Sequence, residues 1–414
     1  MKIEQIDFGS VSEYTEEYKL IVDTTKKLRQ LKGEYYTTWK EPAEWAVKYS
    51  NLRGRPQKVL TITLTPTGCS WAEAGGCTMC GEYEGSQKAV AVSSEFHIAQ
   101  FATALAQYIK KYNPNWLRIE QEGNFINESE VGLDAQLTIL RLASMINGIE
   151  RITIEARPIY ITTERVKLLK ESIEGSNVEL EIGMGLEAQN DVIRNICINK
   201  GESKKVFEDA VKLMNENNIF PLAYVLLKPP FLTEGEAIQE AIDTLHYAYK
   251  IGFKRFSLEP MSLHKYTLVD ALAEAGCYKI PWLWSVLEVA KFCSDIPELG
   301  IGGVGYYPRP RYLAQNHHNE GEGTSDCNKI IWNALKNYSQ YRDFTIFKGL
   351  SCSCQEKWRQ ECMRQDKPLK ERIQSQLALI DIDKYAKRMD NDASDVAENT
   401  IMIAGGTQLN YARK

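Results

Sequence analysis

The chain has 414 residues and a formal net charge of −5, with 43% hydrophobic and 25% charged residues. This length allows one large domain with an appendage, and the composition is typical of a globular protein, not a disordered or fibrous one. The acidic balance excludes a general electrostatic attraction to nucleic acid and leaves only local basic patches for that purpose. No apolar run approaches the roughly 18–20 residues that cross a bilayer, so we expect no membrane partner.

The N-terminus and the cysteine content indicate the compartment. Residues 1–5 lack the apolar core of a signal peptide, so we expect a cytoplasmic location. Ten cysteines in such a protein favour metal or redox chemistry over a disulfide framework. Three of them stand alone at apolar positions and are predicted to be packed thiols: Cys197, Cys277 and Cys293.

Residues 1–57 are predicted to form a helical and aromatic N-terminal extension. Apolar residues at helical spacing predict a helix over 13–31 that stops near Gly33. The next segment interleaves rings and cations: Tyr35, Tyr36, Trp39, Lys40, Trp45, Lys48, Arg53 and Arg55. Rings and cations in this order suit stacking on bases and contact with phosphates, but they also suit an extension wrapped over the edge of a barrel. Both interpretations stay open.

Residues 58–310 alternate between two patterns. Short β-branched and apolar runs predict strands over 59–65, 116–120, 151–156, 178–183, 220–227 and 253–259. Segments with one apolar helical face predict helices over 98–109, 133–140, 163–173, 203–217 and 234–250. Strands separated by helices form βαβ units of a parallel sheet. About six units predict an α/β fold, a partial or complete β/α barrel with its functional residues at the C-terminal strand ends.

A cysteine loop follows the first of these strands. Cys69, Cys77 and Cys80 are spaced C-x7-C and C-x2-C, among glycines that include Gly81. Three thiolates hold three corners of a 4Fe–4S cluster and leave one iron without a protein ligand, and an open coordination site allows chemistry. The alternative is a structural zinc site with a fourth ligand elsewhere. Such sites usually show two paired spacings, and the chain has only five histidines.

The loop and its neighbours resemble the radical S-adenosylmethionine (SAM) enzymes. Most of that superfamily has a shorter first gap, and the long gap followed by Gly-Gly-Cys-Thr-Met-Cys-Gly resembles the radical-SAM subunit of archaeosine synthase and its relatives. The resemblance covers roughly residues 50–365. It implies a partial (β/α)6-type barrel, SAM bound to the open iron, and reductive cleavage of SAM to a 5′-deoxyadenosyl radical. It also implies an electron donor of the flavodoxin or ferredoxin type.

The predicted strand ends match the family at three further places. Residues 122–125, Glu-Gly-Asn-Phe, correspond to the family's Ser-Gly-Ser-Phe turn beside the SAM amino group. Glu155 and Arg157 match its Glu-Ser-Arg-Pro and suit ribose hydroxyls and the SAM carboxylate, although a structural ion pair is the alternative. Glu187 ends a Gly-Leu-Glu, and Arg194 follows about two helical turns later. The expected cofactor-binding residues are therefore Gly81, Gly123, Asn124, Glu155, Arg157, Glu187 and Arg194. No catalytic residue is assigned, because radical chemistry needs no acid–base triad.

Residues 311–414 carry a second cysteine group in the predicted auxiliary-cluster region and tail. Cys327 precedes a helical stretch, Cys352 and Cys354 form a C-x-C pair, and Cys362 lies in the helix-like segment that follows. The relatives have a comparable late cysteine set. We favour an auxiliary iron–sulfur cluster here, with zinc as the alternative. Cys362 is either a fourth ligand or a bystander.

The resemblance implies that the substrate is a lysine-bearing 7-deazaguanine nucleoside in tRNA. The implied reaction is carbon–nitrogen cleavage to archaeosine, with a partner lysine transferase. The alternating Arg and Tyr residues of segment 306–312 support RNA binding, whereas the acidic total opposes it. A free nucleotide or other small metabolite is the alternative substrate, with the second cluster as sulfur donor or anchor. A non-catalytic, metal-stabilised RNA-binding protein is a third interpretation, from another class.

Overall fold

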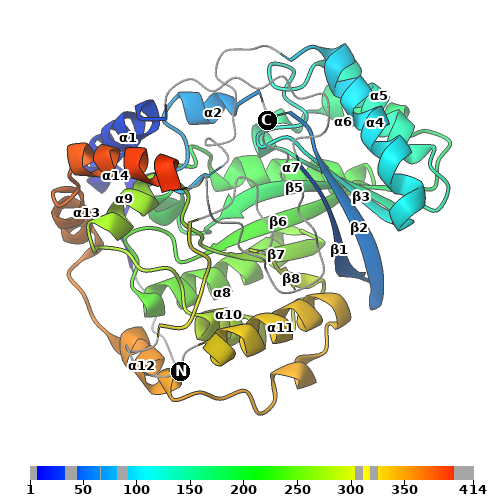
Figure 1. Cartoon of the computed structure of the whole chain (residues 1–414). Helices are drawn as coiled ribbons and strands as arrows, with labels where there is room; N and C mark the ends of the chain where they lie inside the picture. Colours follow the sequence, from blue (N-terminus) through cyan, green and yellow to red (C-terminus); the bar gives the residue numbers. More distant parts are fainter. Residues whose placement is uncertain are drawn as a thin grey trace.

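The computed structural model describes residues 7–32, 44–65, 67–81, 92–303, 311–317 and 325–395. Its centre is one eight-stranded sheet whose spatial order follows the chain order (Figure 1). The strands are β1 (Glu44–Leu52), β2 (Arg55–Thr63), β3 (Trp116–Glu120), β4 (Arg151–Glu155), β5 (Glu179–Glu187), β6 (Phe220–Leu227), β7 (Arg255–Pro260) and β8 (Leu299–Ile301). β1 is antiparallel to β2, and each later pair of neighbours is parallel.

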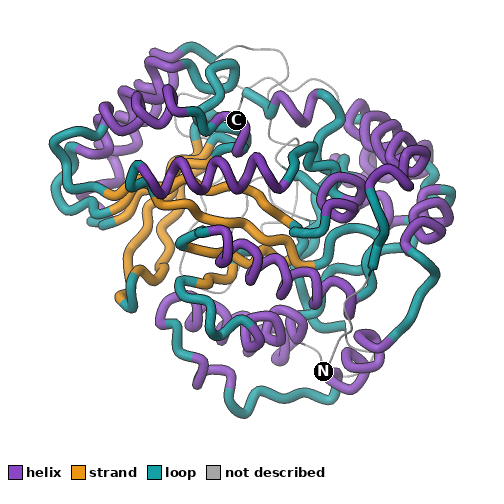
Figure 2. The backbone as a smooth tube through the Cα atoms, turned by 180° about the vertical axis from the view of Figure 1, so that it is seen from behind, coloured by secondary structure: helices purple, strands orange, loops and turns teal. Residues whose placement is uncertain are grey.

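Helices connect the parallel strands and lie around the sheet (Figures 1 and 2). They are α4 (Ser94–Tyr112), α5 (Leu133–Ser144), α6 (Thr163–Ser172), α7 (Lys204–Glu216), α8 (Glu234–Ile251), α9 (Leu268–Glu274) and α10 (Leu283–Phe292). Their limits follow local signals: the hydroxyl of Thr233 accepts from the Glu236 amide at the start of α8, and Gly252 ends that helix at a φ of +104°. The predicted α/β barrel class is confirmed.

The remaining elements frame the barrel. They are η1 (Val11–Tyr14), α1 (Thr15–Gln30), α2 (Ser70–Glu73), η2 (Pro158–Tyr160), the π-helix η3 (Ile193–Cys197), α11 (Ser325–Tyr341), η4 (Phe344–Phe347), α12 (Cys354–Met363), α13 (Leu369–Leu377) and α14 (Ile382–Asp395). α1 packs on α13, α9 and the π-helix, so a helix near the start of the chain lies beside one near its end. In the part of the chain that the structure describes, no helix has the length and apolar character needed to cross a membrane.

Helix α11 covers both edges of the sheet. The side-chain amide of Asn51, on β1, donates to the carbonyl of Gln340 at 2.9 Å. Near the other edge, the amide of Ile301 on β8 donates to the hydroxyl of Ser339 at 3.3 Å. One helix therefore spans from the first strand to the last in the sheet order, and it shields backbone groups that an open edge exposes.

The strand β1 bears on the two interpretations of the N-terminal extension. Residues 44–52 pair along the whole length of β2 and extend the sheet, as expected of an extension that covers a barrel edge. In the adjoining turn, Arg53 pairs with Glu179 at the start of β5, at the end of the strands opposite to the cysteine loop. Residues 35–40 of the aromatic segment lie outside the described residues, and the domain limits at 57 and 310 stay a prediction.

A buried charge cluster stabilises the N-terminal ends of the central strands. The carboxylate of Glu181 is fully buried and accepts from Arg151 at 2.5 Å and from Arg255 at 3.0 Å. Both guanidinium groups lie over the ring of Trp116, at 5.3 and 4.3 Å from its centroid. Burial alone raises the pKa of Glu181, but Arg255 and Arg151 outweigh it and hold that pKa below its ordinary value.

Replacing Glu181 with glutamine should lower the free energy of unfolding by about 3–5 kcal/mol, because Arg255 and Arg151 lose a buried carboxylate and Arg151 keeps only Glu179. Since its pKa is lowered in the folded protein, the contribution of Glu181 is present at neutral pH and is lost as the pH falls below the ordinary carboxyl range. Urea unfolding at pH 7 and at acidic pH measures both effects. The control is Glu216→Gln on the surface, expected to change stability by less than about 0.5 kcal/mol. Equal stability of the two variants at pH 7 would contradict the assignment.

Candidate functional site

The predicted cysteine loop lies beyond the C-terminal end of β2. Cys69 immediately precedes the one-turn helix α2, and the Cys80 amide donates to the Cys77 carbonyl at 3.3 Å. None of the three cysteines of the loop forms a disulfide, and all three are half-buried. Gly76 has a φ of +52°, and a Cβ there would lie 2.6 Å from the Cα of Ala72. The loop therefore folds back on itself in a form that requires glycine at this position.

Neighbouring elements hold the backbone of this loop by its carbonyl groups. Arg29, on α1, donates to the carbonyls of Ala72 at 2.6 Å and of Cys77 at 2.7 Å. From the far side of the barrel, the side chain of Asn199 donates to the carbonyl of Gly76 at 2.8 Å. The loop is thus fixed between α1 and the segment after the π-helix, so the cysteine positions depend on contacts far apart in sequence.

A buried carboxylate that the sequence analysis did not identify joins the cysteine loop to the glycine turn. Glu130 is 3% exposed and accepts from the amide and hydroxyl of Ser70, at 3.1 and 3.0 Å. It also accepts from the amide of Asn124 at 2.5 Å. A Cβ on Gly123 would lie 2.3 Å from a Glu130 oxygen, so glycine is required there. The only sequence signal was the polar stretch that follows β3.

The predicted cofactor residues at β3 and β4 are close to this network. The side-chain oxygen of Asn124 accepts from the amide of Arg157 at 2.5 Å. The guanidinium of Arg157 lies 4.8 Å from the ring centroid of Trp71, which belongs to the cysteine loop, and donates to Glu202 at 2.9 Å. The structure therefore brings together the glycine turn, the residues after β4 and the cysteine loop.

Glu155, at the end of β4, is oriented by a tyrosine from across the barrel. The hydroxyl of Tyr224, on β6, donates to the Glu155 carboxylate at 2.5 Å. Burial raises the pKa of Tyr224, so the phenol keeps its proton and stays a donor. Both residues are half-buried.

Glu187, at the end of β5, forms a buried ion pair. The ammonium of Lys200 lies 3.1 Å from a Glu187 oxygen, and a Cβ on Gly185 would come within 2.4 Å of both groups. Burial alone lowers the pKa of Lys200, but Glu187 and Cys77 outweigh it, and the pKa is raised. Burial raises the pKa of the Cys77 thiol, with Lys200 opposing. A bound metal supplies the positive charge that such a thiol needs to ionise, so these residues fit a metal centre.

Arg194 has a structural environment. Its side chain is fully buried and donates to the carbonyls of Glu202 at 2.9 Å and Ala188 at 3.0 Å, and to the carboxylate of Asp191. These bonds close the loop between β5 and α7 around the π-helix. The predicted contact with a cofactor stays a prediction, while the contacts present are with the chain's own backbone.

Gly81 lies against a histidine that the sequence analysis also did not identify. A Cβ at Gly81 would lie 2.0 Å from Cγ of His264, which follows β7. Burial lowers the pKa of His264 to about 4, and its Nε2 lies 3.0 Å from the hydroxyl of Ser262. A neutral imidazole thus packs on the backbone next to Cys80, and no side chain larger than hydrogen fits between them.

The second cysteine group brings together three of its four predicted members. The sulfur atoms of Cys327, Cys352 and Cys354 all lie within 4.8 Å of one another. Cys362 is buried further along α12, where its carbonyl packs against Gly235 of α8. The structure therefore does not bring Cys362 to the other three thiols.

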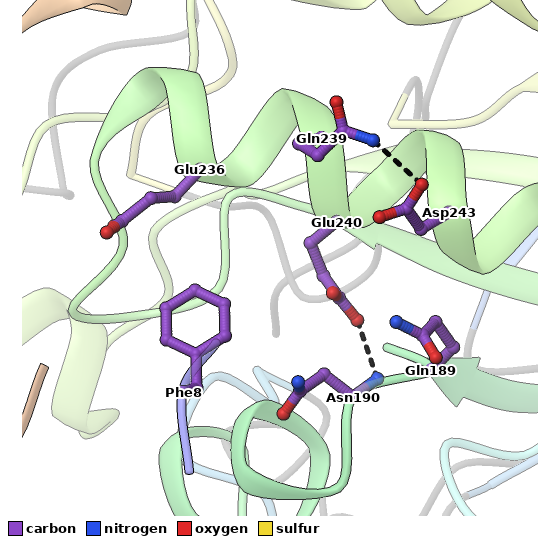
Figure 3. Close-up of a pocket in the computed structure, with 7 residues that line it drawn as sticks. All are labelled: Phe8, Gln189, Asn190, Glu236, Gln239, Glu240 and Asp243. Carbon is purple, nitrogen blue, oxygen red and sulfur yellow. Dashed lines mark hydrogen bonds between the residues drawn. The ribbon is translucent and has the colours of Figure 1, made fainter. Parts of the chain in front are cut away.

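A separate polar pocket lies between the N-terminal segment, the residues after β5, and α8. Figure 3 shows Glu240 pointing from α8 toward Asn190, whose amide donates to it at 2.8 Å, with Phe8 on the other side. Burial raises the pKa of Glu240 to about 7. The pocket contains none of the predicted site residues.

Comparison with known proteins finds relatives that align over most of the chain. An uncharacterized protein of Methanocaldococcus jannaschii is 30% identical over 309 residues, which are 73% of this chain and 81% of that protein. Archaeosine synthase subunit beta of Methanosarcina acetivorans is 30% identical over 324 residues, 77% of this chain and 89% of that protein. The same subunit of Thermococcus kodakarensis is 27% identical over 314 residues, with 74% and 93% covered.

No protein-family model matches the chain. Among solved structures, archaeal Elp3 of Methanocaldococcus infernus aligns with a TM-score of 0.43 at 14% identity, over 62% of this chain and 60% of that one. The protein is a radical SAM enzyme, a class that works with SAM and a 4Fe–4S cluster. Within that class, the chain belongs to the family of archaeosine synthase subunit beta.

Glu130→Gln should loosen the connection between the cysteine loop and the glycine turn. The amide group of glutamine would face backbone donors, and a buried donor without an acceptor costs about 1–3 kcal/mol. We expect lower iron content after anaerobic purification and weaker SAM binding by calorimetry. The matched control is Glu128→Gln, two positions away, whose side chain is 56% exposed and pairs with Arg165. Unchanged iron content and SAM affinity in Glu130→Gln would show that the two loops hold their positions without it.

Glu240→Gln should change how stability depends on pH. Because the folded protein keeps Glu240 protonated up to a pKa of about 7, it binds more protons than the unfolded chain between the ordinary carboxyl range and that value. Wild-type stability should therefore fall as the pH rises through this window. The glutamine variant should show a flatter profile and gain stability relative to wild type at pH 8. Urea unfolding at pH 5 and pH 8 measures this, and parallel profiles would contradict it.

Proposed function

We propose that this enzyme cleaves SAM at a 4Fe–4S cluster held by Cys69, Cys77 and Cys80 and modifies a nucleoside in tRNA. The proposed reaction is the carbon–nitrogen cleavage that forms archaeosine. One observation carries the proposal: the three-cysteine loop lies at the C-terminal edge of a β/α barrel, joined by Glu130 to the glycine turn at Gly123. Functional residues of β/α barrels collect at this edge.

The chain's own residues have distinct roles in this proposal. The three thiolates would hold the cluster, and the backbone around Gly123 and Asn124 would meet the SAM amino group. The cluster and SAM supply, when bound, a 5′-deoxyadenosyl radical that abstracts hydrogen from the substrate. Glu155 accepts from Tyr224 with one oxygen and would accept from ribose hydroxyls with its remaining lone pairs.

Two cations near the cysteine loop suit the charged groups of SAM. Arg157 is fixed by Glu202 and by the Trp71 ring, and its guanidinium is the proposed partner of the SAM carboxylate. The ammonium of Lys200 pairs with the carboxylate of Glu187 beside Cys77. The site therefore contains a buried cation whose charge is balanced by an anion. These groups are part-buried or buried, which favours exclusion of water from a reactive intermediate.

The substrate and partner are assigned from the relatives. Both named relatives are archaeosine synthase subunits, which supports a tRNA substrate and a second subunit, here proposed to be the lysine transferase. Of the segment 306–312, residues 306–310 lie outside the described residues. Arg311 pairs with Asp270 at 2.8 Å and Glu274 at 3.1 Å, so it packs against α9. Tyr312 is 48% exposed and remains a candidate for stacking on a base.

Cys77→Ala should abolish the formation of 5′-deoxyadenosine from SAM, because the cluster loses one of its three ligands. The measurement is chromatographic quantification after addition of dithionite under anaerobic conditions. The matched control is Cys277→Ala, a half-buried cysteine just after the C-terminal end of α9, which should retain wild-type activity. Activity in Cys77→Ala equal to that of the control would refute the assignment of the cluster ligands.

Transfer RNA that carries the lysine-bearing 7-deazaguanine nucleoside should bind with an affinity that falls steeply as salt rises, because binding releases counterions from the phosphates. Filter binding at several salt concentrations measures the slope, with a free nucleoside as comparison. A flat salt dependence together with stimulation of SAM cleavage by a free nucleotide would instead assign a small-molecule substrate. In that case the cluster assignment would stand and the tRNA assignment would fall.

A further inference from the structure

We propose that Cys327, Cys352 and Cys354 bind a single zinc ion and not a second iron–sulfur cluster. Cys327 lies near the start of α11, Cys354 begins α12 and Cys352 precedes it, and their sulfur atoms all lie within 4.8 Å of one another. The sulfur atoms of Cys327 and Cys354 are 4.0 Å apart. Cys354 is buried and the other two are half-buried, so an ion would be enclosed on one side and reachable from the other.

The separation of the sulfur atoms distinguishes one ion from a cluster. In a tetrahedral site with Zn–S bonds of about 2.3 Å, neighbouring sulfurs lie about 3.8 Å apart. In a 4Fe–4S cluster each thiolate binds a different iron, so the width of the cluster separates the sulfurs. Among the residues that the structure describes, the sulfur atoms of Cys327, Cys352 and Cys354 lie close enough together to share one ion. The sulfur atoms of Cys69, Cys77 and Cys80 do not come equally close to one another. The two cysteine groups therefore offer the same kind of ligand, a thiolate sulfur, at different separations.

Two fixed side chains donate hydrogen bonds to the sulfurs. The indole N–H of Trp284 lies 3.2 Å from Sγ of Cys354, and the side-chain amide of Asn316 lies 3.1 Å from Sγ of Cys327. Asn316 is itself held, since its oxygen accepts from the Trp284 amide at 3.3 Å. Both donors are 3% exposed. Donors of this kind, outside the ligands themselves, orient and stabilise metal-bound thiolates.

The geometry leaves Cys362 out of this site. It follows Cys354 by eight positions on α12, and at 1.5 Å per residue that is about 12 Å along the helix axis. Its carbonyl contacts the start of α8, where a Cβ on Gly235 would lie 2.3 Å away. Among the described residues, three thiols therefore form the set, and a water or other small ligand completes the tetrahedron on the half-buried side.

The ion would hold the start of α12 against the barrel. The Trp358 indole on α12 donates to the hydroxyl of Ser285 at 2.9 Å, and that hydroxyl donates to Glu234 at 2.5 Å. Glu234 pairs with Lys228, at the end of β6, at 2.6 Å. A metal at the triad would lock the start of α12 next to this buried network. The proposed role is structural anchoring at the barrel edge that also carries the cysteine loop.

Metal analysis of a variant without the first cluster tests the proposal. The full-length chain with Cys69→Ala, Cys77→Ala and Cys80→Ala removes the ligands of the SAM-binding cluster, and its metals are then counted by mass spectrometry. We expect about one zinc and no iron per chain, with zinc-edge absorption showing sulfur neighbours at about 2.3 Å. Retention of about four irons with matching sulfide in this variant would overturn the proposal in favour of a second cluster.

Single-residue variants in this background assign the ligands. Cys352→Ser should lose the zinc, and added Co²⁺ should give the strong sulfur-to-cobalt absorption of a tetrahedral thiolate site in the parent but not in Cys352→Ser. Cys362→Ser, on α12, is the matched control and should keep both signals. Should Cys352→Ser fail to fold, titration of the parent with a chelator replaces it, with loss of one zinc expected. Zinc binding that survives Cys352→Ser but not Cys362→Ser would refute the ligand set. None of these readouts depends on SAM cleavage or on tRNA, so the proposed function stands or falls separately.

Discussion

The site depends on one buried carboxylate that holds two loops at a fixed separation. The cysteine loop follows β2 and the glycine turn follows β3, and Glu130 accepts from Ser70 in the first and from Asn124 in the second. Donors from both loops converge on this one side chain, so the hydrogen bonds fix the carboxylate and the two loops relative to one another. The three thiols of the cysteine loop and the glycine turn can then keep one geometry relative to each other.

The regular part of this architecture follows from local patterns. The predicted strands and helices between residues 59 and 259 correspond to β2 to β7 and α4 to α8. Each of those strands is an apolar run that must be buried on both faces, and each helix has one apolar stripe, so the pattern determines the element. β8 has only three residues, too few to produce a periodicity. β1 is an aromatic, polar strand whose partner, not its composition, makes it a strand.

The site residues divide in the same way. Cysteines, the glycine turn and the acidic strand ends have local motifs, and their positions at one edge follow from the parallel sheet. Glu130 and Asn199 have no motif, because their function is to contact backbone groups of the cysteine loop that lie 60 and 123 positions away in the chain. Arg194 shows the opposite case. A cation after a strand end suggests an external anion, but this one is fully buried among carbonyl groups of its own loop.

The two cysteine groups show how the fold, not the motif, sets the distances between thiols. Each group offers three thiols, of which two form a short local pair and the third lies further away along the chain. In the first group, a loop that requires glycine at position 76 holds three sulfurs that do not come together within the distance found in the second group. In the second, Cys327 approaches Cys354 from 27 positions away because α11 packs across the sheet edges, and both converge on one point. Sequence spacing specifies the donor atoms. The distance between their sulfurs, which selects one ion or a cluster, is decided by packing that no motif encodes.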